Sequence, residues 1–253
     1  MGKMRRSDLW WDRTWNPITG CSRASEGCRS CWAERFAHRF YYREYGPAYF
    51  EPRFHPERLK QPDAWRVPRR IFTCGMGDLF HEAVPAIWIA FALDRVKLNP
   101  QHEFFVLTKR PDRARKCLCE NLMLRQFLDL PNLWLGVSVE NQEWADKRIP
   151  VLLQIPVQHH FVSIEPMLGP VMLQIPWNLL NAGRDYLKSP GKRCLRWVIL
   201  GAETGPGARP MNLDWARSVR DQCKAAGVPF WFKSAGLQKQ VPADLEIRES
   251  PVP

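Results

Sequence analysis

Short, nearly continuous apolar segments alternate along this chain with segments in which apolar residues recur at helical spacing. The first kind predicts strands and the second predicts helices. Six short segments are almost continuously apolar, rich in β-branched and aromatic residues, and bounded by turn signals, which is typical of strands buried on both faces. These segments are Arg70–Cys74, Glu103–Thr108, Leu133–Val139, His160–Ile164, Trp197–Gly201 and Val228–Phe232. Asp8–Trp15 is a seventh candidate, although it carries charged residues.

Apolar residues at helical spacing occupy the segments between these strands. The predicted helices are Ala86–Leu98, Arg113–Leu128, Glu143–Leu153 and Asn212–Ala226. Asn212 or Asp214 is suited to cap the last of these helices, and Gly227 is suited to end it. Strands that alternate with helices indicate a parallel sheet. Six or seven such units predict an α/β fold that forms a partial or complete β/α barrel of the TIM type.

The chain of 253 residues contains no convincing linker between domains. We therefore expect one β/α barrel domain over residues 1–237. The most polar interruption, Asn181–Arg193, is interpreted as an inserted loop. The last segment, Gln238–Pro253, is interpreted as a C-terminal tail.

A charged residue follows each predicted strand. In a parallel β/α barrel the carboxyl ends of all strands lie on one rim, where active sites are built. The sequence therefore predicts one pocket formed by residues far apart in the chain: Asp78, Lys109, Arg110, Glu140, Glu165, Glu203 and Lys233. The alternative is that the acidic members are helix caps or partners of helix dipoles.

Charge and cysteine content narrow the class of protein. The 37 basic and 26 acidic residues give a net charge of +11, which favours polyanionic partners. The basic start of the chain is not followed by the apolar segment of a signal peptide, and no apolar run reaches membrane-spanning length. We expect a cytoplasmic protein with no membrane contact. In a reducing compartment, clustered cysteines indicate metal ligands or redox groups.

Three of the eight cysteines lie in the glycine-containing loop Trp15–Ala33. Six residues separate Cys21 from Cys28, and two separate Cys28 from Cys31. A [4Fe–4S] cluster ordinarily takes four thiolates, so three would leave one iron open to a ligand. Structural zinc would need a fourth ligand, for which the candidates are His38, His55 and Cys74. The remaining alternative is three unligated thiols in a turn.

Nearly the whole chain resembles a phage-associated family of uncharacterised proteins with a three-cysteine motif, related to the radical S-adenosylmethionine (SAM) barrels. The resemblance rests on WNPITGC with GCRSCWA, GDLFHE, LTKRPDR, GVSVENQ, DKRIPVL, SIEPMLGP, GAETGPGARPM and FWFK. It implies a partial TIM barrel, a [4Fe–4S] cluster on Cys21, Cys28 and Cys31, and SAM on the open iron. It also implies an external electron donor and a 5′-deoxyadenosyl radical that takes hydrogen from a substrate. The commonest radical SAM motif has three residues between its first two cysteines, where this chain has six.

A basic, aromatic helix follows the third cysteine. The apolar spacing of Ser30–Tyr45 predicts a helix that carries Arg35, Arg39 and Arg43 on one face. Residues 1–70 contain 15 Lys and Arg against 8 Asp and Glu. Basic residues interleaved with aromatic ones, here Tyr42 and Tyr45, suit an unpaired or flipped base. We expect a nucleic acid or nucleotide as substrate, and the alternative is a solvated helix face.

The sequence as a whole predicts a radical-SAM-like enzyme. The candidate catalytic residues are Glu165, Glu203 and Lys233. Contacts with SAM or its cluster are assigned to Asp78, Lys109, Arg110, Glu140, Glu165, Glu203, Gly205 and Arg209. One alternative is a non-enzymatic nucleic-acid-binding protein with a structural zinc or iron–sulfur site. Another is a phage interaction protein in which the barrel serves only as a scaffold.

Overall fold

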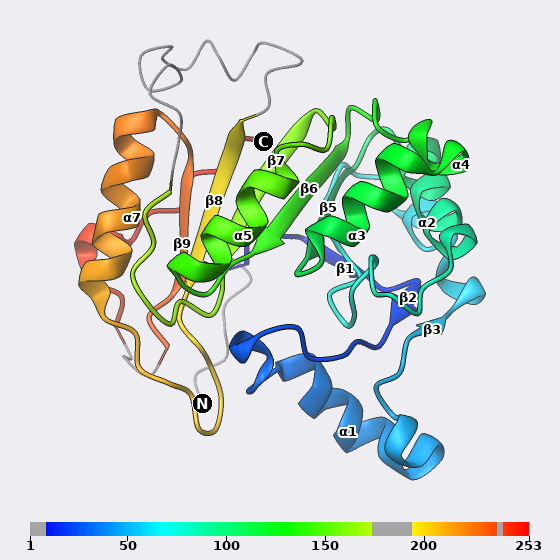
Figure 1. Cartoon of the computed structure of the whole chain (residues 1–253), viewed down its shortest axis with the longest axis horizontal. Helices are drawn as coiled ribbons and strands as arrows, with labels where there is room; N and C mark the ends of the chain where they lie inside the picture. Colours follow the sequence, from blue (N-terminus) through cyan, green and yellow to red (C-terminus); the bar gives the residue numbers. More distant parts are fainter. Residues whose placement is uncertain (1–8, 174–193, 237–239, 253) are drawn as a thin grey trace.

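The computed structural model describes residues 9–173, 194–236 and 240–252. Seven parallel strands form one sheet that curls into a half-barrel (Figure 1). Their order follows the chain: β1 (Arg13–Trp15), β4 (Arg70–Thr73), β5 (Glu103–Thr108), β6 (Leu133–Ser138), β7 (His159–Ile164), β8 (Leu195–Gly201) and β9 (Phe230–Ser234). The prediction of a partial β/α barrel is thereby confirmed. The predicted insertion, Asn181–Arg193, lies outside the described residues.

Helices cover the outer face of this sheet (Figure 1). They are α2 (Ala86–Leu98), α3 (Pro111–Arg115), α4 (Leu122–Arg125), α5 (Gln142–Leu152) and α7 (Leu213–Ala226). Helix α2 has the predicted bounds. Helix α7 begins where the side chain of Asn212 accepts a hydrogen bond from the backbone N–H of Asp214, and it ends at Gly227 in the left-handed conformation. Both predicted end signals are confirmed.

The single helix predicted over Arg113–Leu128 was wrong. The chain instead forms α3, a π-helical turn over Lys116–Glu120, and the separate short helix α4. Asn121 causes the break, because its backbone is extended and its side chain accepts a hydrogen bond from the N–H of Met123. Asparagine favours this capping arrangement over the interior of a helix.

Strand β9 begins two residues later than predicted, at Phe230. The N–H of Val228 donates to the carbonyl of Cys223 and so belongs to the end of helix α7. Pro229, which follows, has no N–H to contribute to the sheet. The later start carries the strand to Ser234, so Lys233 lies within β9.

Each face of the sheet packs into its own core. One core lies between the strands and the outer helices and includes Leu93, Val137 and Val219. The other contains no residue of a helix and therefore fills the inside of the curl; it comprises Trp10, Phe105, Trp134, Phe161, Trp197, Ile199 and Trp231. Because successive side chains of a strand point to opposite faces, both faces must be apolar, which explains the nearly continuous apolar runs.

Trp10 occupies the centre of this inner core. Its ring lies 5.0 to 5.9 Å, between centroids, from the rings of Phe72, Phe105, Phe161 and Trp197. These partners come from four different strands. The segment that precedes β1 therefore fills the inside of the curl and joins the paired strands β4 and β5 to the paired strands β7 and β8, which β6 separates.

The segment predicted as a C-terminal tail also packs against the sheet. It contains a 3₁₀ turn over Ala243–Leu245, in which Leu245 is buried. The N–H of Phe232 donates to the carbonyl of Ile247 over 2.9 Å. The indole of Trp197 donates to the carbonyl of Glu249, also over 2.9 Å. The segment thus satisfies polar groups of β8 and β9.

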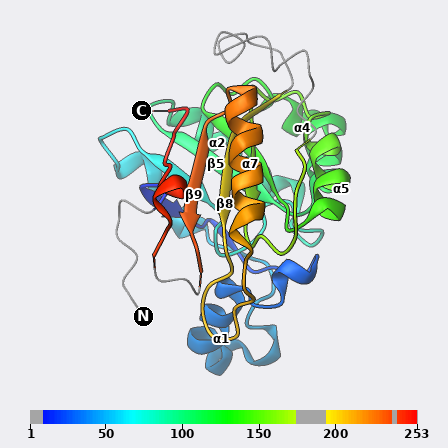
Figure 2. The same cartoon turned by 90° about the vertical axis from the view of Figure 1, so that its left-hand side faces the viewer.

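The remaining elements lie between β1 and β4 in the chain, and most of them lie at the carboxyl end of the sheet. The strand arrows point toward helix α1 (Trp32–Tyr45), which projects beyond that end of the molecule (Figure 1 and Figure 2). Strands β2 (Ile18–Thr19) and β3 (Arg53–Phe54) form a small antiparallel pair before and after it. Short 3₁₀ turns cover Glu26–Cys28, Gly46–Ala48, Pro56–Arg58 and Pro62–Ala64. The turn Pro62–Ala64 lies instead beside the start of β5, where the carbonyl of Pro62 contacts His102.

None of the described helices is long and apolar enough to cross a membrane.

The central position of Trp10 predicts a large effect of its removal. Trp10→Ala should lower the free energy of unfolding by about 3–5 kcal/mol, because it leaves a cavity among four rings. Urea unfolding followed by circular dichroism measures this change. Leu122→Ala, at a position 84% exposed, should change stability by less than about 0.5 kcal/mol. An equal effect of the two substitutions would contradict the central role of Trp10; Trp10→Phe serves if the alanine variant does not fold.

Candidate functional site

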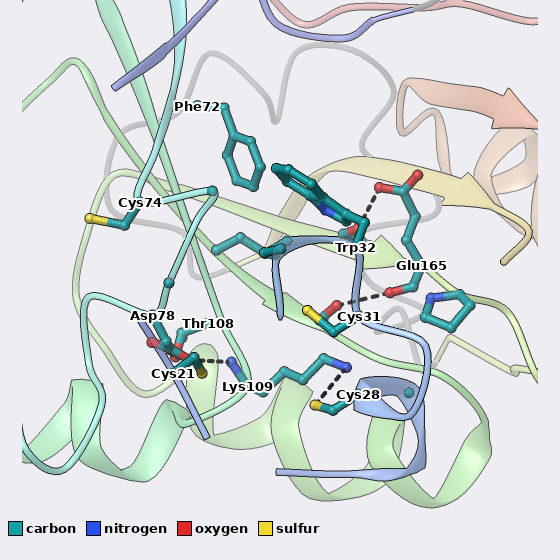
Figure 3. Close-up of a pocket in the computed structure, with 18 of the residues that line it drawn as sticks. Cys21, Cys28, Cys31, Trp32, Phe72, Cys74, Asp78, Thr108, Lys109 and Glu165 are labelled. Atoms are coloured by element: carbon teal, nitrogen blue, oxygen red, sulfur yellow. Dashed lines mark hydrogen bonds between the residues drawn. The ribbon is translucent and has the colours of Figure 1, made fainter. Parts of the chain in front are cut away.

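A cavity of about 590 Å³ opens at the carboxyl end of the sheet. Its wall includes the three loop cysteines and most of the charged residues predicted to meet there (Figure 3). The predicted residues in the wall are Cys21, Cys28, Cys31, Asp78, Lys109, Arg110, Glu165, Glu203 and Lys233. Of the other predicted residues, Glu140 is buried beneath the loop, and Gly205 and Arg209 belong to the segment after β8.

Glu140 anchors the cysteine loop to the end of strand β6. Its side chain is fully buried and forms ion pairs with Lys109, from the end of β5, and with Arg148 of helix α5, the latter over 3.0 Å. The hydroxyl of Ser25 donates to the same carboxylate over 2.6 Å. Gly27 permits this approach, because a Cβ atom there would lie 2.4 Å from the Glu140 side chain.

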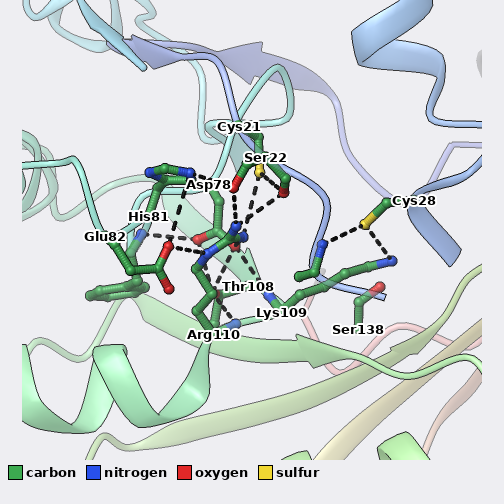
Figure 4. Close-up of polar contacts among 12 residues, drawn as sticks. Cys21, Ser22, Cys28, Asp78, His81, Glu82, Thr108, Lys109, Arg110 and Ser138 are labelled. Atoms are coloured by element: carbon green, nitrogen blue, oxygen red, sulfur yellow. Dashed lines mark hydrogen bonds and ion pairs between the residues drawn. The ribbon is translucent and has the colours of Figure 1, made fainter. Parts of the chain in front are cut away.

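Asp78 performs a similar role after strand β4, on the other side of β5. Its carboxylate accepts hydrogen bonds from the hydroxyl of Thr108 over 2.8 Å and from the backbone N–H of Lys109 over 3.2 Å. Arg110 lies 3.3 Å away and also contacts Glu82 over 2.7 Å (Figure 4). The other arm of this guanidinium donates to the carbonyl and hydroxyl of Ser22. Arg110 thus connects the loop to Asp78.

Two of the three thiols face a cation. The guanidinium of Arg110 lies 3.5 Å from the sulfur of Cys21, and the ammonium of Lys109 lies 3.6 Å from the sulfur of Cys28 (Figure 4). Burial disfavours ionisation of Cys28, but Lys109 and hydrogen bonds from the loop backbone outweigh it and lower the pKa of this thiol. Burial and the charge of Asp78 raise the pKa of Cys21 to about 12 despite Arg110. The loop therefore favours a thiolate first at Cys28.

The third thiol, Cys31, immediately precedes helix α1, and burial raises its pKa. Within the described part of the chain, no group of three or more His, Cys, Asp or Glu side chains is close enough to hold a metal ion. The three cysteines thus share one cavity wall, and the iron–sulfur cluster expected on them stays a prediction.

Two further ion pairs lie at the ends of strands β7, β8 and β9. The ammonium of Lys233 lies 3.0 Å from a carboxylate oxygen of Glu165 and 5.1 Å from the ring of Trp11. Glu203 accepts two hydrogen bonds from the side chain of Arg209, over 2.6 and 2.9 Å. The Arg209 hydrogen bonds lower the pKa of Glu203, which keeps this carboxylate ionised. Each acidic residue of the cavity thus lies beside a basic one.

The predicted nucleic-acid residues separate into two groups. Arg35 is committed within the protein, because its guanidinium donates to the carbonyls of Thr204 and Pro206, each over 3.1 Å. Gly205 has a φ of +97°, and a Cβ atom there would lie 2.6 Å from the same guanidinium. This packing accounts for the glycine predicted as a cofactor contact. Arg39 and Arg43 are exposed.

The two tyrosines considered for base stacking, Tyr42 and Tyr45, also have partners within the protein. The rings of Tyr42 and Tyr49 lie 5.7 Å apart, and the guanidinium of Arg53 lies 3.7 Å above the ring of Tyr45.

Several residues of the site were not found from the sequence. Ser22 and Ser25 orient the loop, but an isolated serine near a glycine has no distinctive pattern. Arg148 lies within a predicted helix, where a basic residue ordinarily faces solvent. Trp11 precedes the first strand and contributes its ring to the cavity wall. The only signal in the sequence was that Trp11 lies among the charged residues of Asp8–Trp15.

Comparison with known proteins identifies a family without an assigned activity. The family model described as "protein of unknown function (DUF5131)" matches residues 7–247. The chain therefore belongs to the DUF5131 family. No curated protein and no solved structure match the chain. The predicted phage association and the predicted relationship to radical SAM enzymes are not part of this match, and both stay predictions.

The burial of Glu140 predicts a large cost for neutralising it. Glu140→Gln should lower the free energy of unfolding by about 3–5 kcal/mol, because Lys109 and Arg148 would keep their charges without a buried partner. The matched control is Glu143→Gln, which removes an exposed ion pair with Lys147 on the same helix and should change stability by about 0.5 kcal/mol or less. Chemical unfolding of both variants measures the difference. Equal stability of the two would refute the anchoring role of Glu140.

Proposed function

We propose that this protein is a radical-SAM-type enzyme that holds a [4Fe–4S] cluster on Cys21, Cys28 and Cys31 and binds SAM in the adjoining cavity. One observation carries the proposal: three thiols from one loop line the same cavity as charged side chains from the ends of five strands or their following loops. In β/α barrels this rim is where active sites lie. A volume of about 590 Å³ is within the range of small-molecule and cofactor sites.

The cations beside the thiols suit a negatively charged cluster. Lys109 and Arg110 each point a donor at a cysteine sulfur, and such donors stabilise negative charge on a cluster and influence its reduction potential. Glu140 and Asp78 hold these two cations in place. We therefore assign Lys109 and Arg110 to cluster contacts and Glu140 and Asp78 to positioning.

Other side chains near the cavity provide groups that match SAM. SAM carries an amino group, a carboxylate and an adenine ring. The Glu165–Lys233 pair offers one acceptor for the amino group and one donor for the carboxylate. Phe72 and Trp32 provide apolar ring surface in the same cavity (Figure 3). Glu203 is already occupied by Arg209, so Glu165 is the better candidate for a direct contact.

A cluster in this position would supply a one-electron reduction. Held by Cys21, Cys28 and Cys31, the cluster would pass one electron from an external donor to SAM. SAM would then be cleaved to methionine and 5′-deoxyadenosine as one hydrogen atom is removed from the substrate. The cofactors carry this chemistry, while the protein orients them and excludes competing reactions. We propose the cytoplasm as its location, because clustered thiols such as Cys21, Cys28 and Cys31 are kept reduced there.

For the substrate we propose a nucleic acid or nucleotide, as the net charge of +11 favours. The glutamates of the cavity are paired with basic residues. The site therefore presents hydrogen-bond donors as well as acceptors to a nucleotide. The reaction performed on this substrate is not assigned.

The proposal predicts an oxygen-sensitive cluster. Anaerobic reconstitution should give a brown protein with about four irons per chain, as one [4Fe–4S] unit requires. Alanine at Cys21, Cys28 or Cys31 should abolish the cluster, as iron analysis and visible absorption measure. Cys223→Ala is the matched control, because Cys223 is buried in helix α7. Stoichiometric zinc without visible absorption would favour the alternative of a non-enzymatic nucleic-acid-binding protein.

The proposal also predicts SAM binding and cleavage. With dithionite as reductant, the reconstituted protein should form 5′-deoxyadenosine slowly even without substrate. Glu165→Gln should weaken SAM binding by at least about tenfold, because a hydrogen bond to a charged group contributes about 1.5–3 kcal/mol. Isothermal titration measures the binding, and Glu143→Gln is the matched control. A fully loaded cluster whose paramagnetic spectrum does not respond to SAM would refute the SAM assignment.

A further inference from the structure

Helix α1 exposes aromatic side chains of a kind that soluble proteins usually bury. Only Ala33 and Ala37 of its 14 residues are buried. Trp32 is 53% exposed, Phe36 is 44% exposed and Phe40 is 55% exposed. The rings of Phe36 and Phe40 lie 4.5 Å apart between centroids. None of the three aromatic residues belongs to either core, and the helix projects beyond the barrel (Figure 2).

The exposed aromatic residues share their face with two arginines. Trp32, Phe36 and Phe40 follow one another at intervals of four residues, which places them in a stripe along the helix. At 3.6 residues per turn, Arg39 and Arg43 fall within the same sector of about 100°. Arg39 lies 5.4 Å from the ring centroid of Phe40. The five residues therefore form one surface, which we call the aromatic track.

The aromatic track ends at the cavity. Trp32 immediately follows the third cysteine and belongs to the cavity wall, where it lies between Phe72 and Glu165 (Figure 3). Phe36 and Phe40 continue outward from it along α1. A polymer that rests on the helix would thus reach the cavity without crossing another part of the protein.

We propose that the aromatic track binds single-stranded nucleic acid and guides one base into the cavity. The proposal rests on the enzymatic function given above, for which it names the form of the substrate. Aromatic rings stack with unpaired bases of any sequence, and neighbouring cations bind the phosphates. The arginines of the track and the net charge of +11 complement a polyanion. An apolar peptide would gain nothing from Arg39 and Arg43.

The spacing of the track favours a single strand over a duplex. The ring centroids of Phe36 and Phe40 are 4.5 Å apart, farther than the roughly 3.4 Å between stacked nucleotides of a duplex strand, and only an unpaired base can stack on a protein ring. A strand that places one base at each ring is therefore extended and unstacked. Its bases are then free to enter a cavity, as chemistry on a base requires.

Oligonucleotide binding to the reconstituted protein tests the proposal. Fluorescence anisotropy is measured with labelled octathymidylate, octauridylate and a DNA duplex of the same length. Both single strands should bind more tightly than the duplex. Phe36→Ala/Phe40→Ala should weaken single-strand binding at least tenfold through the loss of stacking, and Phe36→Trp/Phe40→Trp should retain it. Phe91→Ala is the matched control, because Phe91 is 43% exposed on helix α2 and should bind like the wild type.

A salt series tests the role of the arginines. Each phosphate contact on a single strand contributes about 0.7 to the slope of log affinity against log salt concentration. Arg39→Gln/Arg43→Gln should therefore reduce this slope by about 1.4. The proposal is overturned if single strands do not bind at low salt, if the duplex binds equally well, or if the phenylalanine double variant binds within twofold of the wild type. Far-UV circular dichroism confirms that each variant is folded.

The same preparations separate this inference from the proposed function. If the cluster forms and SAM is cleaved but no single strand binds, the aromatic track is wrong and the enzyme assignment stands. If single strands bind with the expected dependence on Phe36 and Phe40 but no iron is retained, the enzyme assignment is wrong. The track would then be the surface of a nucleic-acid-binding protein.

Discussion

The arrangement of the site depends on one fully buried carboxylate, that of Glu140. A buried charge is tolerated only when it is paired and hydrogen-bonded. The partners that satisfy Glu140 come from three different places: Lys109 at the end of β5, Arg148 on α5, and Ser25 in the cysteine loop. The requirement to pair this charge therefore fixes the loop over the rim of the sheet. It also directs Lys109 toward the sulfur of Cys28.

The residues that stabilise the half-barrel and the residues that form the candidate site lie at different levels along the strands. Aromatic rings fill the inside of the curl around Trp10, whereas the charged residues lie at the carboxyl ends of the strands. Tight packing at one level holds the strands in register, so the side chains at the rim have fixed positions. The cysteine loop and helix α1 then cover this rim, and they bring thiols, cations and exposed aromatic residues to the same opening (Figure 1).

Local patterns predicted most of the fold. Apolar runs located the strands, because both faces of the sheet are buried, and Asn212 and Gly227 located the ends of α7. The failures came from competing local interactions. Asn121 capped a new helix inside a segment of continuous helical spacing, and the end of α7 used the residues expected to begin β9. Such competition depends on hydrogen bonds that periodicity does not describe.

The sequence by itself also determined which charged residues meet, since parallel strands place their carboxyl ends on one rim. It could not determine how these residues pair. Glu140 was predicted to contact a cofactor but lies beneath the loop, Glu203 binds Arg209, and Arg35 holds the segment around Gly205. These pairings join residues that are up to 171 positions apart. Only the tertiary structure decides them, because the distance between two charges depends on how the strands and loops pack together.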